Sequence, residues 1–186
     1  MKRLAINNIL KLENLKSEIE HERASSLYLR LRKQEKEDGS YALIREHLKN
    51  LIVQYEANHW SDELKITDEQ VEESDLAETL VRAENEFNYK RKEFIKNRLK
   101  ELGLKQNDLA KILGHRKGYM SELINGLRPF SKEDIVIINR LLKISLDALI
   151  PPFIKQDKVA HIKKTLKTIR RNKIKLTKKD FDLQLT

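Results

Sequence analysis

The side chains that most often perform catalysis or bind metals are sparse and widely separated in this sequence. The chain contains no cysteine, which excludes a disulfide framework, a thiolate zinc site and a cysteine nucleophile. Its five histidines lie far apart without HExxH spacing, and no GxSxG, GxGxxG or phosphate-binding loop motif occurs. The carboxylates between Asp62 and Glu86 fit a solvated acidic helix better than a metal site. We therefore predict a protein that is not an enzyme and needs no cofactor.

The remaining feature of the sequence that could bind a partner is its charge, which is unevenly distributed along the 186 residues. Residues 61–88 hold ten Asp or Glu against two Lys or Arg, a net charge of −8. Residues 89–150 carry +7 and residues 151–186 carry +8. A basic half favours a polyanionic partner, because Lys and Arg release condensed counterions when they neutralise phosphates. A lysine-rich surface that is only solvated, with no polyanionic partner, explains the net charge equally well.

Amphipathic helices must position these charges, because the chain has only five glycines and three prolines. Apolar residues at helical spacing predict helices over residues 14–37 and 41–57, joined by a turn at Asp38-Gly39-Ser40. Two helices with so short a connection form an antiparallel hairpin, which we assign to residues 1–60. The N-terminus lacks the apolar core of a signal peptide, and no run of about 18 apolar residues occurs to span a bilayer. We expect no membrane association and a cytoplasmic location.

A group of short helices is predicted after an acidic connector, which comprises residues 61–88 and is helical in part. Four of the five glycines lie between Gly103 and Gly126, where they separate apolar patterns typical of short helices. A helix, a turn opened by glycine and a second, crossing helix form a helix-turn-helix arrangement, which we assign to residues 89–152. Residues 153–186 form a basic C-terminal extension. The predicted fold class is therefore all-α.

Polar as well as apolar positions in this region follow a known pattern, formed by Gln106, Leu109, Ala110, Gly114, Ser121, Asn125, Gly126 and Pro129. With this pattern the region resembles the Xre family of helix-turn-helix domains, which includes the lambda and 434 repressors. The resemblance covers about residues 89–152 and implies a five-helix domain that binds DNA. It departs from the family at Lys105, where an N-cap Thr or Ser is usual, and at Gly118, where a base-reading side chain is usual.

The resemblance also implies the residues that contact DNA, since the second helix of the motif enters the major groove with its N-terminal end. The implied base contacts are Arg116, Lys117, Ser121 and Glu122. The implied phosphate contacts are Gln106, Tyr119, Asn125, Arg128, Ser131 and Lys132. Arg and Lys donate well to guanine, whereas a phosphate contact positions the protein without reading sequence. The expected partner is a pseudo-palindromic operator bound by a homodimer.

A looser similarity involves the hairpin, the acidic segment and the stretch RKEFIKNRLKELGLKQNDLAKILGHR, which together resemble HigA-type antitoxins of type II toxin–antitoxin pairs. This implies a HigB-like toxin that cleaves mRNA on the ribosome and is basic because it must hold RNA. The predicted toxin contacts are apolar at Leu48, Ile52 and Tyr55, and acidic at Asp68, Glu69, Glu72 and Glu73. The chain would neutralise this toxin and repress its own operon.

Two other functions fit the same sequence. One is a stand-alone transcriptional regulator whose hairpin mediates only oligomerisation. The other is an RNA- or ribosome-associated adaptor, which the basic C-terminal extension favours. If the hairpin is a separable domain, deleting residues 1–60 is expected to spare operator binding, provided that a dimer survives.

Overall fold

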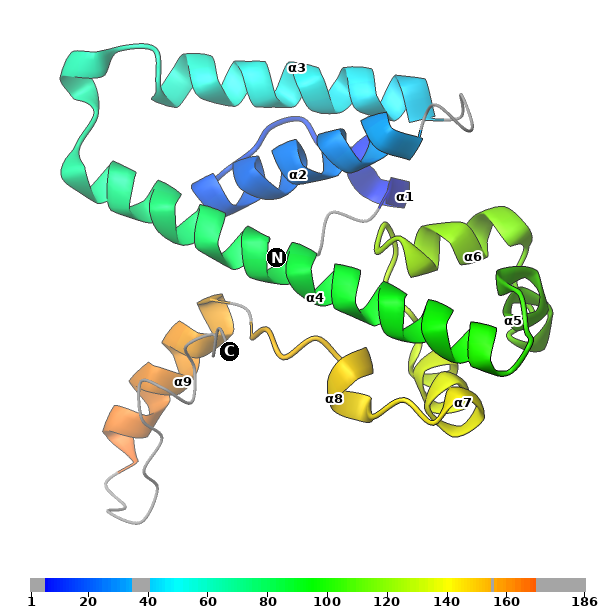
Figure 1. Cartoon of the computed structure of the whole chain (residues 1–186). Helices are drawn as coiled ribbons and strands as arrows, with labels where there is room; N and C mark the ends of the chain where they lie inside the picture. The colour runs from blue at the N-terminus through cyan, green and yellow to red at the C-terminus, as the bar shows by residue number, and fades with distance from the viewer. Residues whose placement is uncertain (1–5, 35–40, 155, 170–186) are drawn as a thin grey trace.

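The structure is a computed structural model that describes residues 6–34, 41–154 and 156–169. Over these residues it is helical and contains no strand, which confirms the predicted fold class (Figure 1). The elements are α1 (Ile6–Ile9), α2 (Glu18–Gln34), α3 (Ala42–His59), the 3-10 turn η2 (Glu63–Lys65), α4 (Asp68–Glu101), α5 (Gln106–Ile112), α6 (Lys117–Ile124), α7 (Lys132–Leu142), α8 (Leu146–Leu149) and α9 (Gln156–Thr168). No helix in the described part of the chain has the length and apolar character needed to span a bilayer.

One long helix, α4, runs through both halves of the molecule (Figure 1). It begins at its predicted cap, where Thr67 Oγ1 accepts a hydrogen bond from the Gln70 amide at 3.2 Å. The helix then continues for 34 residues, or about 50 Å at 1.5 Å per residue, because no glycine or proline interrupts it. The boundary that we place between residues 88 and 89 therefore falls inside a helix. Residues 68–88 of the acidic segment are the first half of this helix, whereas residues 61–67 connect α3 to it.

Helices α2 and α3 form the expected hairpin, and α2 also packs along the first half of α4 (Figure 1). The turn predicted at Asp38-Gly39-Ser40 lies outside the described residues. The buried core of this part comprises Ile6, Ile9, Leu15, Ala24, Leu27, Leu31, Leu48, Leu51 and Tyr55. On α4 the residues that face α2 are the small Ala77 and Val81, which pack with Ile19, whereas Val71 and Leu76 are exposed. We call α1, α2, α3 and α4 up to residue 87 the N-terminal bundle.

The second half of α4 packs with α5, α6, α7 and α8 around a separate apolar core. Its buried residues are Ile95, Leu99, Leu109, Ala110, Met120, Leu123, Ile124, Phe130, Ile138, Leu142, Ile144 and Leu149. We call this part the helix-turn-helix domain. The basic C-terminal extension contains α9, and its residues 170–186 lie outside the described part of the chain.

Leu127 connects the two halves. It follows α6 in sequence, yet its side chain is 2% exposed and packs in the core of the N-terminal bundle. Gly126 permits this path: its φ is +70°, and a Cβ there would lie 2.9 Å from Cγ of Asn88 on α4. The Gly126 carbonyl also accepts a hydrogen bond from Arg30 at 3.3 Å. Leu127 and Gly126 therefore join the helix-turn-helix domain to the hairpin, and a chain lacking residues 1–60 would expose Leu127 to water.

Candidate nucleic-acid interface

The turn between α5 and α6 is held against the start of α7. Gly114 adopts a φ of +70°, and the next residue, His115, approaches Asp134 with its Nε2 at 2.9 Å from Oδ1. Asp134 also closes the predicted capping box with Ser131, in which each backbone amide donates to the other side chain at 3.0 Å. The position of α6 relative to α7 is therefore fixed by polar contacts as well as by the apolar core.

The unusual Lys105 at the start of α5 is compensated from within the helix. A lysine side chain has no acceptor to offer the first amides of a helix. Instead, Asp108 Oδ2 accepts a hydrogen bond from the Lys105 amide at 2.8 Å, and the Asp108 charge lies in the first turn, where the helix dipole favours an anion. The helix therefore begins as in the family although its cap residue differs.

The contact between α5 and α6 depends on the small side chain of Ala110, which is 1% exposed. We expect Ala110→Leu to lower the free energy of unfolding by about 1–3 kcal/mol, because the added methylenes overpack the joint. Urea denaturation followed by circular dichroism measures this change. The exposed Ile112 on the same helix supplies the control, since Ile112→Leu should change stability by less than about 0.5 kcal/mol. Equal stability of the two variants would contradict close packing at Ala110.

Among the predicted base contacts, Arg116 and Lys117 are the two with exposed side chains. Arg116 is the N-cap residue of α6 and Lys117 is its first residue. Within the described residues neither side chain forms a hydrogen bond or an ion pair, so their charges are available to an incoming ligand. Gly118 beside them has open space where a Cβ would lie, so no steric demand accounts for this glycine.

Glu122 and Arg128, predicted to contact a base and a phosphate, instead form an ion pair with each other. Glu122 also accepts a hydrogen bond from the Tyr41 hydroxyl at 3.0 Å, so its carboxylate faces the N-terminal bundle. The Arg128 guanidinium lies 5.1 Å from the centroid of the Tyr119 ring, in a cation–π contact. Both charged side chains therefore pair with other groups of the protein. The sequence alone did not indicate Tyr41, whose hydroxyl donates to Glu122.

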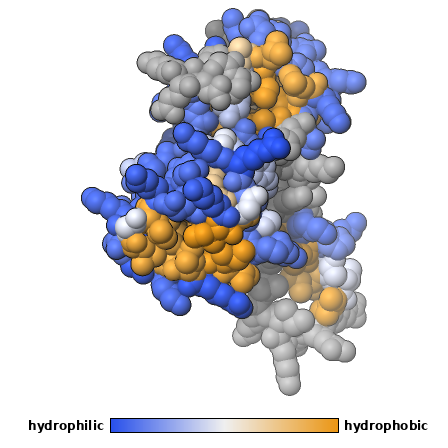
Figure 2. All heavy atoms as spheres, turned by 90° about the vertical axis from the view of Figure 1, so that its right-hand side faces the viewer, coloured by the Kyte–Doolittle hydropathy of each residue, from blue (hydrophilic) through white to orange (hydrophobic). Residues whose placement is uncertain are grey.

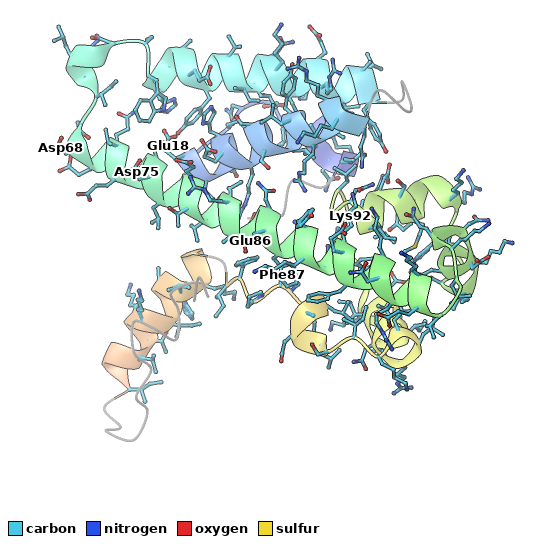
Figure 3. The ribbon with its side chains drawn as sticks, in the orientation of Figure 1. Glu18, Asp68, Asp75, Glu86, Phe87 and Lys92 are labelled. Carbon is cyan, nitrogen blue, oxygen red and sulfur yellow. The ribbon has the colours of Figure 1, made fainter. Side chains whose placement is uncertain are left out.

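Two further predicted contacts also have internal partners. Asn125 Oδ1 accepts a hydrogen bond from Lys92 Nζ at 2.7 Å, and its amide group donates to Ser121 Oγ at 3.3 Å. The interaction with Lys92, which lies on α4 (Figure 3), attaches the end of α6 to the long helix. The sequence analysis missed this role of Lys92, because nothing in the local pattern pairs residues 33 positions apart.

The remaining predicted phosphate contacts lie at helix beginnings or on the surface. Gln106 is half-buried at the first position of α5, and Tyr119 is 40% exposed on α6. Ser131 caps α7, and the exposed Lys132 follows it as the first residue of that helix. Figure 2 looks onto this end of the molecule and shows largely hydrophilic atoms around an apolar patch. The exposed apolar side chains of this half include Leu102, Ile112, Val136 and Ile137.

The residues predicted to bind a toxin separate into two groups. Leu48 and Tyr55 are buried, at 0% and 5% exposure, and Ile52 packs partly buried against the same core. Their apolar surface is covered by α1, α2 and the rest of α3, so the expectation that Leu48 and Tyr55 contact a partner is wrong. The acidic group Asp68, Glu69, Glu72 and Glu73 is exposed on the first turns of α4. This group lies at the opposite end of α4 from the helix-turn-helix domain.

Comparison with known proteins identifies one part of the chain. Residues 95–149 match the model of the helix-turn-helix family, which covers the second half of α4 through α8 and less than a third of the chain. No curated protein and no solved structure matches the chain. Residues 95–149 therefore form an Xre-like helix-turn-helix domain, a non-enzymatic type that binds DNA, and the match supports a sequence-specific DNA-binding regulator.

Proposed function

We propose that this protein represses transcription at its own operator and neutralises a basic, RNA-cleaving toxin in the manner of HigA-type antitoxins. The observation that carries the proposal is the separation of two exposed, oppositely charged surfaces along α4. The cations Arg116 and Lys117 lie at one end, on the domain that matches the helix-turn-helix family. The carboxylates at the start of α4 lie at the other end. Two partners of opposite charge can therefore be bound together.

For operator binding, the proposal assigns base contacts to the N-terminal end of α6 and a backbone contact to Lys132. Proteins of this kind usually bind pseudo-palindromic sites as twofold dimers, so the proposed binding form is a homodimer. The apolar patch in Figure 2 supports this, because monomeric proteins seldom leave large contiguous apolar surfaces in water. The half-site spacing of one helical turn of DNA, about 34 Å, then follows from the dimer.

For toxin binding, we retain the acidic residues as contacts and replace the buried apolar residues with exposed apolar ones. The exposed apolar side chains near the start of α4 and on α3 are Val53, Leu64, Val71 and Leu76. An acidic surface raises the association rate with a basic partner, and this effect weakens as salt screens the charges. The same carboxylates would repel RNA held by the toxin, so RNA and this protein cannot occupy the same surface of the toxin together.

The steering role of the acidic group can be tested by charge reversal. We expect Glu69→Lys/Glu72→Lys/Glu73→Lys to slow association several-fold at low salt, because these three residues are exposed beside the proposed contact. The partner to test is the product of any short reading frame found adjacent to this gene, and stopped-flow mixing at two salt concentrations measures the rate.

The matched control is Glu46→Lys/Glu86→Lys/Glu133→Lys, which changes the net charge equally at exposed positions elsewhere. Equal slowing by both triple variants would contradict local steering and leave only a net-charge effect. If the adjacent gene product does not bind at all, toxin neutralisation is excluded and the chain is a regulator alone.

A further inference from the structure

An open groove lies at the acidic end of the N-terminal bundle, where the start of α2, the end of α3 and the start of α4 meet. Its volume is about 620 Å³. It is lined by Glu18, His21, Val53, Glu56, Ala57, Trp60, Ser61 and Ser74. This volume is within the range of about 300–1,000 Å³ that is usual for ligand pockets. The lining combines two carboxylates with apolar and aromatic surface.

Glu18 is the unusual member of this lining, since it is a carboxylate at 3% exposure. Its Oε1 accepts hydrogen bonds from the Tyr55 hydroxyl at 2.9 Å and from Trp60 Nε1 at 3.0 Å. Its Oε2 is buried and makes no hydrogen bond within the described residues. Figure 3 shows Glu18 between α3 and α4, at the same end of the bundle as Asp68 and Asp75. A buried carboxylate oxygen without a donor is costly, because its lost hydration is not replaced.

His21 presents a second buried polar atom without a hydrogen bond. Its Nε2 lies 3.2 Å from Glu56 Oε1, and because a carboxylate only accepts, the proton of this hydrogen bond is on Nε2. Its Nδ1 is buried and makes no hydrogen bond within the described residues. This nitrogen lies 3.9 Å from Glu18 Oε2. A carboxylate oxygen and a ring nitrogen therefore both lack a hydrogen-bond partner at the wall of the same groove.

The electrostatic surroundings also favour a cation. Burial, the hydrogen bond to Glu18 and the charges of Glu18, Glu73 and Glu20 together raise the pKa of Tyr55 above its ordinary value. Burial raises the pKa of Glu22 as well; His21 opposes this rise, whereas the carboxylates of Glu78 and Glu18 add to it. Carboxylates from α2 and α4 are thus crowded around this end of the bundle.

The aromatic side chain of the groove suits a planar cation. The Tyr55 ring is already stacked between His21 and His59, with centroid distances of 5.0 Å and 4.1 Å, so the aromatic ring that the groove offers a ligand is Trp60, which lines it. A guanidinium group stacks on such rings and carries five donors in a fixed plane, whereas an ammonium group is a compact, strongly hydrated charge. The lining therefore fits arginine better than lysine.

We propose that this groove binds an arginine side chain of a basic partner protein, with the guanidinium donating to Glu18 and pairing with Glu56. The groove's chemistry stands on the contacts described above, and only the identity of the partner as a toxin rests on the proposed function. DNA and RNA are excluded as occupants, because their phosphates would meet carboxylates. The Glu18 oxygen without a donor, the second carboxylate and the aromatic surface are all satisfied by this one group.

Trp60 allows a direct test on the full-length protein, because it is the only tryptophan of the chain. Its emission is recorded during titration with the peptide acetyl-Leu-Arg-Leu-amide and with the same peptide containing citrulline, which has the shape of arginine but no charge. We expect a saturable change with the arginine peptide and at least about tenfold weaker binding of the citrulline peptide. Equal binding of the two peptides would overturn the proposal.

Glu18→Gln is the informative variant, because the amide side chain keeps an oxygen for Tyr55 and Trp60 but places an N–H donor where Oε2 was. We expect arginine-peptide binding to weaken at least about tenfold while the midpoint of thermal unfolding is unchanged or higher. Glu46→Gln, an exposed change on α3 outside the groove, should bind as the wild type does. Undiminished binding by Glu18→Gln would contradict the assignment.

The chain's own basic extension is the alternative occupant. Replacing Arg170, Arg171 and Lys173 with glutamine in the full chain should leave Trp60 emission unchanged in the absence of peptide. A change would show that the extension fills the groove and would overturn binding of a partner. If arginine-selective binding holds while the adjacent gene product does not bind, the groove stands and the antitoxin function fails.

Discussion

The double variant Arg116→Ala/Lys117→Ala is expected to bind its operator more weakly by about 2–6 kcal/mol, taking about 1–3 kcal/mol for each base-contacting side chain. Both residues are exposed at the beginning of α6 and have no partner within the described protein, so their loss does not disturb the fold. Fluorescence anisotropy with DNA from the protein's own promoter, at one fixed salt concentration, measures the change. Affinity for unrelated DNA should fall much less.

Lys132→Ala is the matched comparison, because it removes one exposed cation at the start of α7. If Lys132 contacts a phosphate, this variant weakens binding to all sequences alike and lowers the slope of log affinity against log salt by about 1. The two variants thus separate sequence reading from backbone binding. Unchanged operator affinity of the Arg116/Lys117 double variant would show that α6 does not read the DNA.

The helix-turn-helix domain was the part most predictable from sequence. Gly103, Gly114 and Gly126 lie where the chain turns and adopt positive φ. Because helix spacing, caps and turn residues there all indicate the same structure, local pattern was sufficient. The capping box at Ser131 and the burial of Ala110 agree with this local pattern.

The continuity of α4 was not predictable from the change in charge at residue 88. A shift from acidic to basic composition alters the electrostatics of a helix but does not end it, since helices end at glycine, proline or a cap. The face of α4 that α2 covers is formed by Ala77 and Val81, whose side chains give a weak apolar signal. The packing of this helix on the hairpin was therefore missed, and the apolar residues of the hairpin were interpreted as a surface for a partner.

Some of the contacts that redefine the candidate DNA interface join residues far apart in sequence. Tyr41 contacts Glu122 across 81 positions, and Arg30 contacts Gly126 across 96. No local pattern encodes such pairs. The family resemblance placed Glu122 at a base-reading position, but in this chain its carboxylate pairs with Arg128 and faces the N-terminal bundle. The base-reading surface that we propose is therefore shorter than the family pattern implies and consists of the first turn of α6.

The junction between the two halves leads to the last prediction, that Leu127→Ala lowers the free energy of unfolding by about 2–5 kcal/mol. Leu127 belongs to the loop after α6 but is buried in the core of the N-terminal bundle. Its truncation leaves a cavity at the point where the halves meet. Urea denaturation followed by Trp60 emission reports the bundle, and circular dichroism reports the whole chain.

Because one side chain joins both halves, the two probes should give coincident transitions that shift together in the variant. Ile150→Ala is the control: Ile150 is 47% exposed after α8, and its truncation should cost less than about 1 kcal/mol. A Trp60 transition that stays at the wild-type midpoint while the circular dichroism transition moves would show that the halves unfold independently. In that case Leu127 would not couple the N-terminal bundle to the helix-turn-helix domain.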